Sequence, residues 1–380
     1  LPESAIDFLK SQGYEKLYPP QEDSVKSGLL NGKSVLVSAP TASGKTLIAM
    51  LSMMSYISKN KGKIIYLSPL RALAAEKFSE FKKLEKVALG NKIKVGISTG
   101  DFENIEKNLE KNNILILTNE KMDSIIRHGA EWIDEIGLVI ADEVHLIGDE
   151  NRGPTLEMIL TQLKLLETKP QIIGLSATIT NSDEIANWLG CNLIKNDWRP
   201  VPLAEGVCDA GEITMSDGKT FEVERSIRGT PIDLGVQSVK DGGQSLVFAE
   251  TRTRSKSLAT KAADAISQIL AKKELTQLEK TSKKILSENE HTELVKTLAI
   301  LVKKGVAFHH AGLNQNCRET IETEFRNGTI KLLSSTPTLA AGVNLPARRV
   351  VISNVNRYNA KVGANRPISI LEYKQLCGRA

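Results

Sequence analysis

The stretch Ser34-Val-Leu-Val-Ser-Ala-Pro-Thr-Ala-Ser-Gly-Lys-Thr46 decides how this 380-residue chain folds. An apolar, β-branched run ends in a loop of small residues, and an apolar helical run from Leu47 to Ile57 follows. A strand, a glycine-containing loop and a helix N-terminus in this order surround phosphate oxygens with backbone N–H groups. Lys45 would add a positive charge and Thr46 a hydroxyl for Mg²⁺. The stretch therefore predicts a phosphate loop.

The predicted loop comprises Ala39, Pro40, Thr41, Ala42, Ser43, Gly44, Lys45 and Thr46. A strict phosphate loop has glycine at its first position, where this chain has Ala39. The alternative is that Gly-Lys-Thr occurs by chance in an ordinary turn. The rest of the chain has to distinguish these two interpretations.

Length and composition favour a two-domain globular protein. A chain of 380 residues is too long for one compact core and suits two domains of roughly 150–200 residues. Its hydrophobic content of 41% and charged content of 25% are ordinary for such domains. The net charge of +5 permits a polyanionic partner without requiring one, and an aromatic content of 4% argues against a large stacking platform.

The cysteines and the hydropathy pattern argue against several other classes of protein. The four cysteines form no Cys-x-x-Cys pair, so we expect neither a metal site nor a disulfide framework; they are Cys191, Cys208, Cys317 and Cys377. No apolar run approaches the roughly 18 residues that span a bilayer, and no signal-peptide pattern is present. We therefore expect a cytoplasmic protein, and the start at Leu1 rather than methionine favours a trimmed product.

Short apolar runs alternate with amphipathic helical segments, such as Arg71–Lys86, through the first half of the chain. The apolar runs predict buried strands at Ser34–Ser38, Ile64–Leu67, Ile93–Ile97, Ile114–Leu117, Leu138–Ala141 and Ile172–Leu175. This alternation is typical of a parallel sheet with helices on both faces. Polar clusters follow these strands, and ligands of such sheets bind at the carboxyl ends of the strands.

The second half of the chain repeats this pattern without a second phosphate loop. Strands are predicted at Ser245–Ala249, Val306–His309, Lys331–Ser335 and Arg349–Ser353, and helices at Arg252–Leu270 and Arg318–Arg326. The Gly-, Pro- and Asp-rich segment Trp198–Ile232 is the expected junction between the halves. We interpret the charged segment Lys272–His291 as a solvent-exposed helical insertion.

Asp142 and Glu143 come directly after a predicted strand. Beside a phosphate loop, Asp142 would hold Mg²⁺ through water, and Glu143 would orient and deprotonate the attacking water. The alternative is an acidic cap at a helix N-terminus. The phosphate loop and the acid pair, each following its own strand, together indicate a nucleoside triphosphatase.

The histidines do not indicate a metal site. His145 has no cysteine or histidine at ligand spacing. His309 and His310 are adjacent on a predicted strand and would point to opposite faces, so they cannot easily share one ion.

Three polar clusters carry hydroxyl and amide donors that suit the phosphates of a nucleic-acid strand. They contain Pro69 and Arg71, then Ser98, Thr99 and Gly100, and then Thr336 and Thr338. Each cluster is weak evidence alone, because such residues occur in any loop. Together they predict sequence-tolerant contacts that position a strand without reading bases.

The ordered motifs resemble those of superfamily 2 helicases. The corresponding segments are the Q motif at Tyr18–Gln21, motif I at Ala39–Thr46, motif Ia at Ser68–Ala74, motif Ib at Ser98–Asp101, the DExH box at Asp142–His145, motif III at Ser176–Thr178, motif IV at Leu246–Ala249, motif V at Ser335–Pro346 and the start of motif VI at Gln375–Ala380. Three further segments resemble the Ski-like branch and, within it, the archaeal Hjm (Holliday-junction migration) helicases; they are Trp198–Leu203, Phe308–Leu313 and Ala340–Ala347.

This resemblance implies an α/β fold of two tandem RecA-like domains, 1–197 and 198–380, with parallel sheets and an ATP cleft between them. It implies ATP and Mg²⁺ as cofactors, with Gln21 reading the adenine and Arg379 contacting the γ-phosphate. The residues that would couple hydrolysis to movement are His145, Ser176, Thr178 and Gln375.

The resemblance also implies an ATP-dependent DNA helicase that moves 3′→5′ and unwinds forked or branched DNA in replication-fork repair and recombination. Such a protein would act as a monomer on single-stranded and forked DNA, in association with the nucleoid. One alternative is the same motor acting on RNA, because phosphate contacts do not distinguish the two sugars. The other is a nucleotide-dependent clamp with little turnover.

The resemblance also implies two residues that contact the nucleic-acid strand, and a β-hairpin. Thr118, which precedes Asn119 where this branch frequently has proline, and His310 would contact the strand. A strand-separating β-hairpin would lie within Val355–Ile370, with Tyr358 and Val362 near its tip. An ordinary surface loop is the alternative.

The chain ends at Ala380, inside motif VI. We therefore expect the second domain to be incomplete at its C-terminus, and ATP turnover to be slower than in a longer chain.

Overall fold

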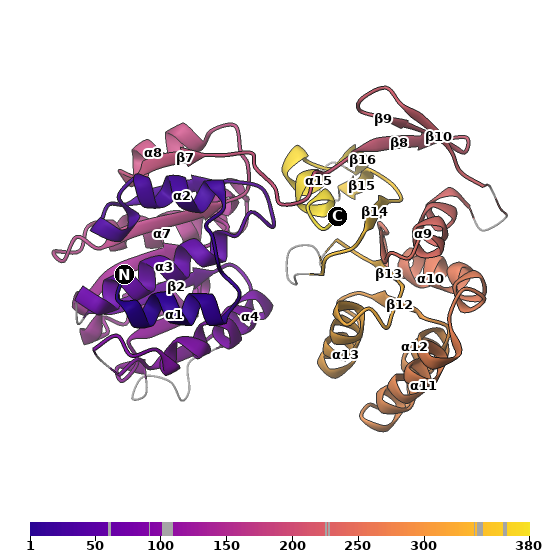
Figure 1. Cartoon of the computed structure of the whole chain (residues 1–380), viewed down its shortest axis with the longest axis horizontal. Helices are drawn as coiled ribbons and strands as arrows, with labels where there is room; N and C mark the ends of the chain where they lie inside the picture. The colour runs from indigo at the N-terminus through magenta and orange to yellow at the C-terminus, as the bar shows by residue number, and fades with distance from the viewer. Residues whose placement is uncertain are drawn as a thin grey trace. The chain divides into compact units, whose positions relative to one another are not determined.

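The computed structural model describes residues 1–59, 62–90, 92–100, 109–224, 226, 229–337, 339, 345–359 and 363–380. They form two compact units, Leu1–Val201 and Pro202–Ala380, and each unit has its own parallel sheet and core. Figure 1 shows the helices and strands of both units. Among the described helices, none is long and apolar enough to span a bilayer.

A seven-stranded parallel sheet forms the centre of the first unit, in the order β3-β4-β2-β5-β6-β1-β7. The strands are β1 (Val35–Ser38), β2 (Lys63–Ser68), β3 (Val95–Ser98), β4 (Ile114–Thr118), β5 (Ile136–Ala141), β6 (Gln171–Ser176) and β7 (Asn192–Lys195). Because β6 pairs with both β1 and β5, the loops that follow these three strands meet at one edge of the sheet.

Helices cover both faces of this sheet. They are α1 (Glu3–Ser11), α2 (Pro19–Lys26), α3 (Lys45–Lys59), α4 (Arg71–Phe81), α6 (Asn119–Arg127), α7 (Gly153–Lys164) and α8 (Ser182–Leu189). Successive strand residues point to opposite faces. Val35 and Val37 therefore share a core with Ile48 of α3, and Leu36 shares one with Leu160 of α7.

The second unit contains a parallel sheet in the order β12-β13-β11-β14. Its strands are β11 (Ser245–Phe248), β12 (Val306–His309), β13 (Leu332–Ser335) and β14 (Arg349–Ile352). The helices are α9 (Thr230–Lys240), α10 (Arg252–Ser267), α11 (Lys272–Ser287), α12 (Glu293–Lys303), α13 (Gln315–Arg326) and α15 (Ile370–Cys377). They enclose one continuous apolar core that includes Phe248, Phe308 and Phe325.

Two antiparallel elements complete the second unit. One is a small sheet of β8 (Gly206–Asp209), β9 (Glu212–Met215) and β10 (Thr220–Glu222) in the order β10-β9-β8. The other is a hairpin of β15 (Asn356–Asn359) and β16 (Ala364–Pro367), in which Tyr358 pairs with Asn365.

The predicted parallel strands are all present, with differences at their ends. The helix predicted over Arg71–Lys86 ends at Phe81 and continues as a 3-10 turn over Lys82–Lys86. In the first unit, the edge strand β3 begins at Val95 rather than at the predicted Ile93. The sequence did not predict β7, in which only Ile194 is buried, and the predicted junction Trp198–Ile232 contains the sheet of β8–β10.

The prediction for the charged segment after Lys272 was wrong in one respect. The segment is helical, but α11 buries one face, which includes Leu278 and Ile285. Both side chains belong to the core of the second unit, and only the charged face of α11 is solvated.

Candidate active site

The phosphate loop joins β1 directly to α3. Ala42 and Gly44 have φ angles of 66° and 84°, in the left-handed region that glycine adopts at no steric cost. A Cβ atom on Gly44 would lie 2.1 Å from Nε2 of Gln21, so the position requires glycine for space as well. These two left-handed residues turn the loop back toward the helix N-terminus.

Ala39, the departure from the strict loop pattern, continues the strand pairing of β1. Its N–H donates to the carbonyl of Ser176 over 3.2 Å. Its side chain is fully buried in the core beneath the sheet edge. A methyl group is accommodated here because it points into the core.

Lys45 and Ser43 hold the donors that a phosphate would need. Nζ of Lys45 donates to the carbonyls of Ala39 and Pro40 over 2.8 and 2.9 Å, and so lies across the loop. The hydroxyl of Ser43 is buried and has no hydrogen-bond partner among the described residues. A buried donor without a partner is costly, and a phosphate oxygen would satisfy it.

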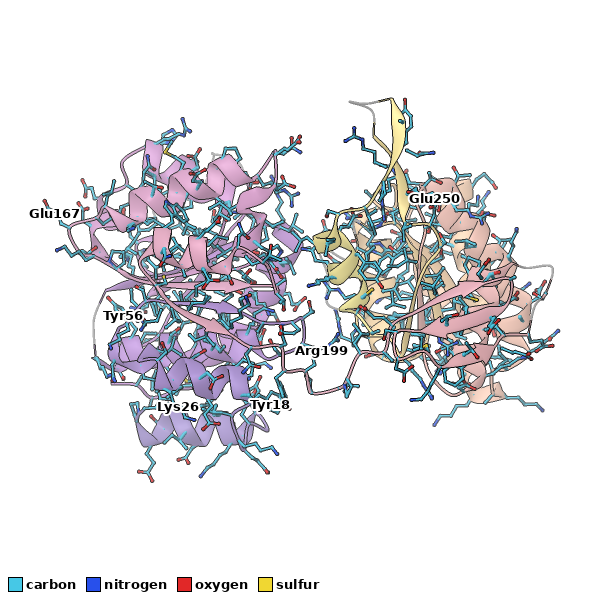
Figure 2. All side chains as sticks on the ribbon, turned by 90° about the horizontal axis from the view of Figure 1, so that it is seen from above. Tyr18, Lys26, Tyr56, Glu167, Arg199 and Glu250 are labelled. Carbon is cyan, nitrogen blue, oxygen red and sulfur yellow. The ribbon has the colours of Figure 1, made fainter. Side chains whose placement is uncertain are left out.

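Gln21 ties α2 to this loop. Its Oε1 accepts from the N–H of Tyr18 over 2.8 Å, and its Nε2 donates to the carbonyl of Gly44 over 3.2 Å. The ring of Tyr18, labelled in Figure 2, packs against that of Trp198 with a centroid distance of 4.5 Å. The predicted adenine reader therefore lies directly beside the phosphate loop.

The acid pair follows β5, as predicted. Oδ2 of Asp142 accepts from the hydroxyl of Tyr66 over 2.6 Å, and Oδ1 accepts from the N–H of Glu143 over 3.0 Å. Burial and the neighbouring Glu143 raise the pKa of Asp142, while Lys77 is the first of the groups that lower it. Glu143 has a φ angle of 53°, a strained conformation of the kind that clusters at functional sites.

His145 links Glu143 to the loop after β6. The N–H of Ala177 donates to Nδ1 of His145 over 3.1 Å, so Nδ1 carries no proton. The proton on Nε2 is then directed at Oε2 of Glu143, 3.2 Å away. Burial, with a smaller effect of Lys45, lowers the pKa of His145 to about 4 and keeps the ring neutral.

The oxygen atoms near the loop suit a hard cation. Mg²⁺ prefers hydroxyl, carboxylate and water oxygens, and Thr46 and Asp142 offer the first two. Oγ1 of Thr46 also accepts from Nζ of Lys77 over 2.7 Å. Sequence reasoning missed Lys77, because it lies inside a helix with no motif of its own. In the described ranges, no group of three or more His, Cys, Asp or Glu side chains offers another metal site.

The residues of the first unit that we expect to contact a nucleic-acid strand differ in their exposure to solvent. Arg71 is exposed at the start of α4, whereas Pro69 and Ser98 are buried at the ends of β2 and β3. Thr99 and Gly100 are half-buried. The hydroxyl of Ser98 has no hydrogen-bond partner among the described residues, which leaves a donor at this edge of the sheet.

Thr118 has a structural role. Its Oγ1 caps α6 by accepting from the N–H of Lys121 over 3.3 Å. Thr178, the last residue of the third motif, is half-buried, and Ser176 is fully buried. A contact of Thr118 with a nucleic acid stays a prediction.

In the second unit, a pair between buried His309 and half-buried Glu322 lies at the end of β12. Nε2 of His309 lies 2.8 Å from Oε1 of Glu322 on α13. The carbonyl of His309 accepts from the N–H of Thr336 over 3.1 Å, which joins the ends of β12 and β13. His310 is buried and stacks on Phe308 with a centroid distance of 5.4 Å. His310 and Thr336 thus lie at the carboxyl ends of neighbouring strands.

The remaining predicted residues lie nearer the C-terminus. Gln375 is half-buried on α15, and the carbonyl of Arg379 accepts from the N–H of Ala347 over 2.7 Å. The predicted hairpin is present, and its Tyr358 is 69% exposed. Thr338 and Val362 lie outside the described residues.

Comparisons with known proteins agree with this arrangement. Residues 18–185 match the DEAD/DEAH box helicase family, and residues 230–380 match the helicase conserved C-terminal domain. The chain is 43% identical over its whole length to "ATP-dependent DNA helicase Hel308" of Methanocella arvoryzae, and 43% identical over 98% of its length to the protein of that name from Pyrococcus horikoshii. Two helicase families thus match the chain in tandem, and the chain is similar to the Hel308 helicases over nearly its whole length.

The Hel308 relatives are longer than this chain. The chain spans 51% of the Methanocella protein and 50% of the Pyrococcus protein. Its two units have the α/β arrangement of tandem RecA-like helicase domains. The resemblance inferred from the motifs is therefore confirmed.

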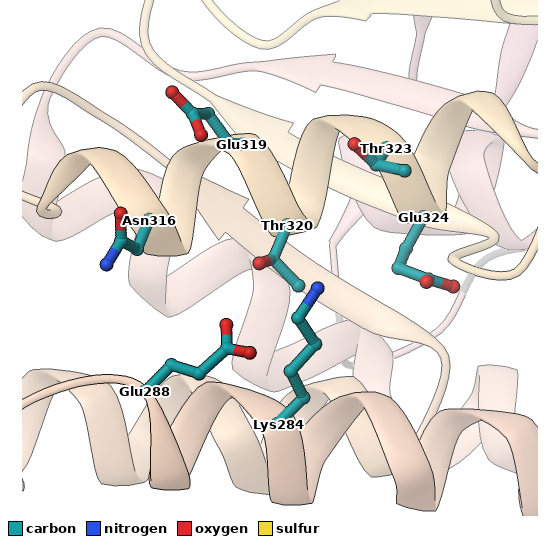
Figure 3. A pocket seen from close by; sticks show the side chains of 7 residues that line it. All are labelled: Lys284, Glu288, Asn316, Glu319, Thr320, Thr323 and Glu324. Carbon is teal, nitrogen blue, oxygen red and sulfur yellow. The ribbon is translucent and has the colours of Figure 1, made fainter.

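The second unit also has a polar pocket of about 220 Å³. Figure 3 shows the side chains that line it, which come from α11, the residue after it, and α13; they are Lys284, Glu288, Asn316, Glu319, Thr320, Thr323 and Glu324. None of the predicted site residues lines this pocket.

Proposed function

We propose that this chain is the motor of an ATP-dependent DNA helicase, a 3′→5′ translocase that unwinds forked or branched DNA during repair and recombination. The observation that carries the proposal is the set of loops after β1, β5 and β6, which places Lys45, Glu143 and His145 at one edge of one sheet. The similarity to proteins named as DNA helicases supports the choice of substrate.

In this proposal each residue has a separate task. Ser43 and Lys45 bind phosphate oxygens, and Thr46 and Asp142 hold Mg²⁺. A bound Mg²⁺ would offset the negative charge on the phosphates. Glu143, oriented by His145, takes the proton of the attacking water.

His145 also connects Glu143 to the loop after β6. Any movement of Glu143 changes its contact with His145, and His145 holds the backbone of Ala177 in the loop after β6. Ser176 and Thr178 flank that backbone. We propose that this chain of contacts couples hydrolysis to nucleic-acid contacts, and that Arg379 acts on the γ-phosphate.

The test is an unwinding assay with the full-length protein on a forked duplex that carries a 3′ tail. We expect ATP-dependent unwinding, and we expect Lys45→Ala to abolish both unwinding and ATP turnover. Single-stranded DNA should stimulate ATP turnover more than RNA of equal length. Wild-type behaviour of Lys45→Ala would contradict the proposal, and stronger stimulation by RNA would favour an RNA helicase.

A further inference from the structure

Lys77 is a buried lysine that reaches the phosphate loop from a neighbouring helix. It lies on α4, and only 9% of its surface is exposed. Its Nζ donates to Oγ1 of Thr46 over 2.7 Å and to Oε2 of Glu80 over 3.2 Å. Burying an ammonium group is costly unless it is paired, so the contacts with Thr46 and Glu80 have to offset the free-energy cost of burying Lys77.

The charges around Lys77 belong to the acid pair as well as to its own helix. Burial is the largest single effect and acts to lower the pKa of Lys77, but the carboxylates of Glu80, Asp142 and Glu76 together outweigh it, so the pKa is raised and the ammonium stays charged.

The contact with Thr46 has a definite chemical direction. An ammonium group only donates, so Oγ1 of Thr46 uses one lone pair to accept from Lys77 and keeps the other for a cation. Oδ2 of Asp142 is held in the same way by the hydroxyl of Tyr66. Both proposed Mg²⁺ ligands are thus oriented by buried partners, and such partners set metal affinity.

We propose that Lys77 is a positioning residue of the Mg²⁺ site, which orients the hydroxyl of Thr46. This inference rests on the proposed function and adds a residue to it. An alternative role for Lys77 is to pair with Glu80 and stabilise α4 without any effect on the metal.

The experiment measures binding of a fluorescent ADP analogue to the 380-residue chain while free Mg²⁺ is varied. We compare the wild type with Lys77→Gln/Glu80→Gln, which removes both charges of the Lys77–Glu80 pair. Glu80→Gln alone serves as the first control. Lys82→Gln is the second, because Lys82 is half-exposed and pairs with Glu85 three residues later, as Lys77 does with Glu80.

We expect the double variant to need about 10-fold to 100-fold more Mg²⁺ for half-maximal binding, the usual effect of losing a partner of a metal ligand. Binding in the presence of EDTA should not change, and both controls should keep the wild-type Mg²⁺ requirement. The single variant Lys77→Arg, which retains the positive charge and the hydrogen-bond donors, should keep most of the wild-type affinity for Mg²⁺. Circular dichroism on thermal unfolding reports whether each variant is folded.

One result would contradict the role of Lys77, and another would contradict the metal site itself. An unchanged Mg²⁺ requirement in a folded double variant with a lower unfolding temperature would overturn the inference and leave Lys77 a structural residue. Mg²⁺-independent binding by the wild type would instead contradict the metal site of the proposed function.

Discussion

At the scale of single residues, the phosphate loop depends on space as much as on backbone freedom. Gly44 and Gly32 have similar φ angles, 84° and 80°. A Cβ atom on Gly44 would collide with Nε2 of Gln21, whereas a Cβ atom on Gly32 would have nothing within 4 Å. A comparison of alanine variants at Gly44 and Gly32 therefore separates the cost of backbone strain from the cost of displacing Gln21.

We predict that Gly32→Ala lowers the free energy of unfolding by about 1–2 kcal/mol, the usual cost of a left-handed non-glycine residue, and that Gly44→Ala lowers it further because it also displaces Gln21. Only Gly44→Ala should also weaken nucleotide binding, because it pushes Gln21 away from the loop. Denaturant titration and a fluorescent nucleotide check the two effects. Equal nucleotide affinity in both variants would contradict the role assigned to Gln21.

His145 makes stability depend on pH. Its pKa of about 4 in the folded chain lies below the ordinary value of 6.5, mainly because the ring is buried. The unfolded chain therefore binds a proton first as the pH falls. The stabilisation from the neutral ring is complete above pH 6.5 and is lost progressively as the pH falls toward 4.

We predict that the free energy of unfolding of the wild type falls more steeply between pH 6.5 and pH 4.5 than that of His145→Gln. Urea titrations at several pH values within this window measure the difference. Parallel profiles for the two proteins would show that His145 ionises normally in the folded chain.

At the scale of helices and strands, α11 is part of the core of the second unit. Ile285 on α11 is fully buried, whereas Ile300 on α12 is 59% exposed. We predict that Ile285→Ala lowers the free energy of unfolding by about 2–5 kcal/mol, the range for a buried large-to-small change. Ile300→Ala should stay within about 0.5 kcal/mol of the wild type. Chemical denaturation compares them, and equal losses would contradict the burial of α11.

The hairpin of β15 and β16 leaves Tyr358 exposed to solvent, and we expect this side chain to separate the strands of a forked duplex. One base-pair step holds about 1.4 kcal/mol of stacking, which corresponds to a factor of about ten. We predict that Tyr358→Ala in the full-length protein slows unwinding of a forked duplex by about this factor without changing ATP turnover. Phe221→Ala on β10, also at an exposed aromatic residue, is the control and should unwind normally.

At the scale of the whole molecule, the two units have separate cores. The contacts described above for the phosphate loop come from residues within Leu1–Val201. We predict that residues 1–201 alone fold and bind ATP, and that ATP at 100 times its Kd stabilises them by about 2.7 kcal/mol. Calorimetry of the 1–201 fragment should then show a higher unfolding temperature with ATP than without it. An unfolded or non-binding 1–201 fragment would contradict this division.

The same division explains which features were predictable. The strands β1, β2, β4, β5 and β6 are nearly continuous apolar runs because both of their faces are buried. The edge strand β7 buries only Ile194, so its sequence carries little apolar signal. The sheet of β8–β10 is short and largely exposed, and its sequence was interpreted as a linker.

The sequence alone determined the phosphate loop, the acid pair and the parallel strands that carry them, because each is a local pattern of adjacent residues. The tertiary structure alone decided how these groups are held. Lys77 reaches Thr46 across 31 positions, Tyr66 reaches Asp142 across 76, and His145 reaches Ala177 across 32. Such contacts leave no periodic or spacing signal, because they depend on which strands are neighbours in the sheet and on which side chains are buried beside them.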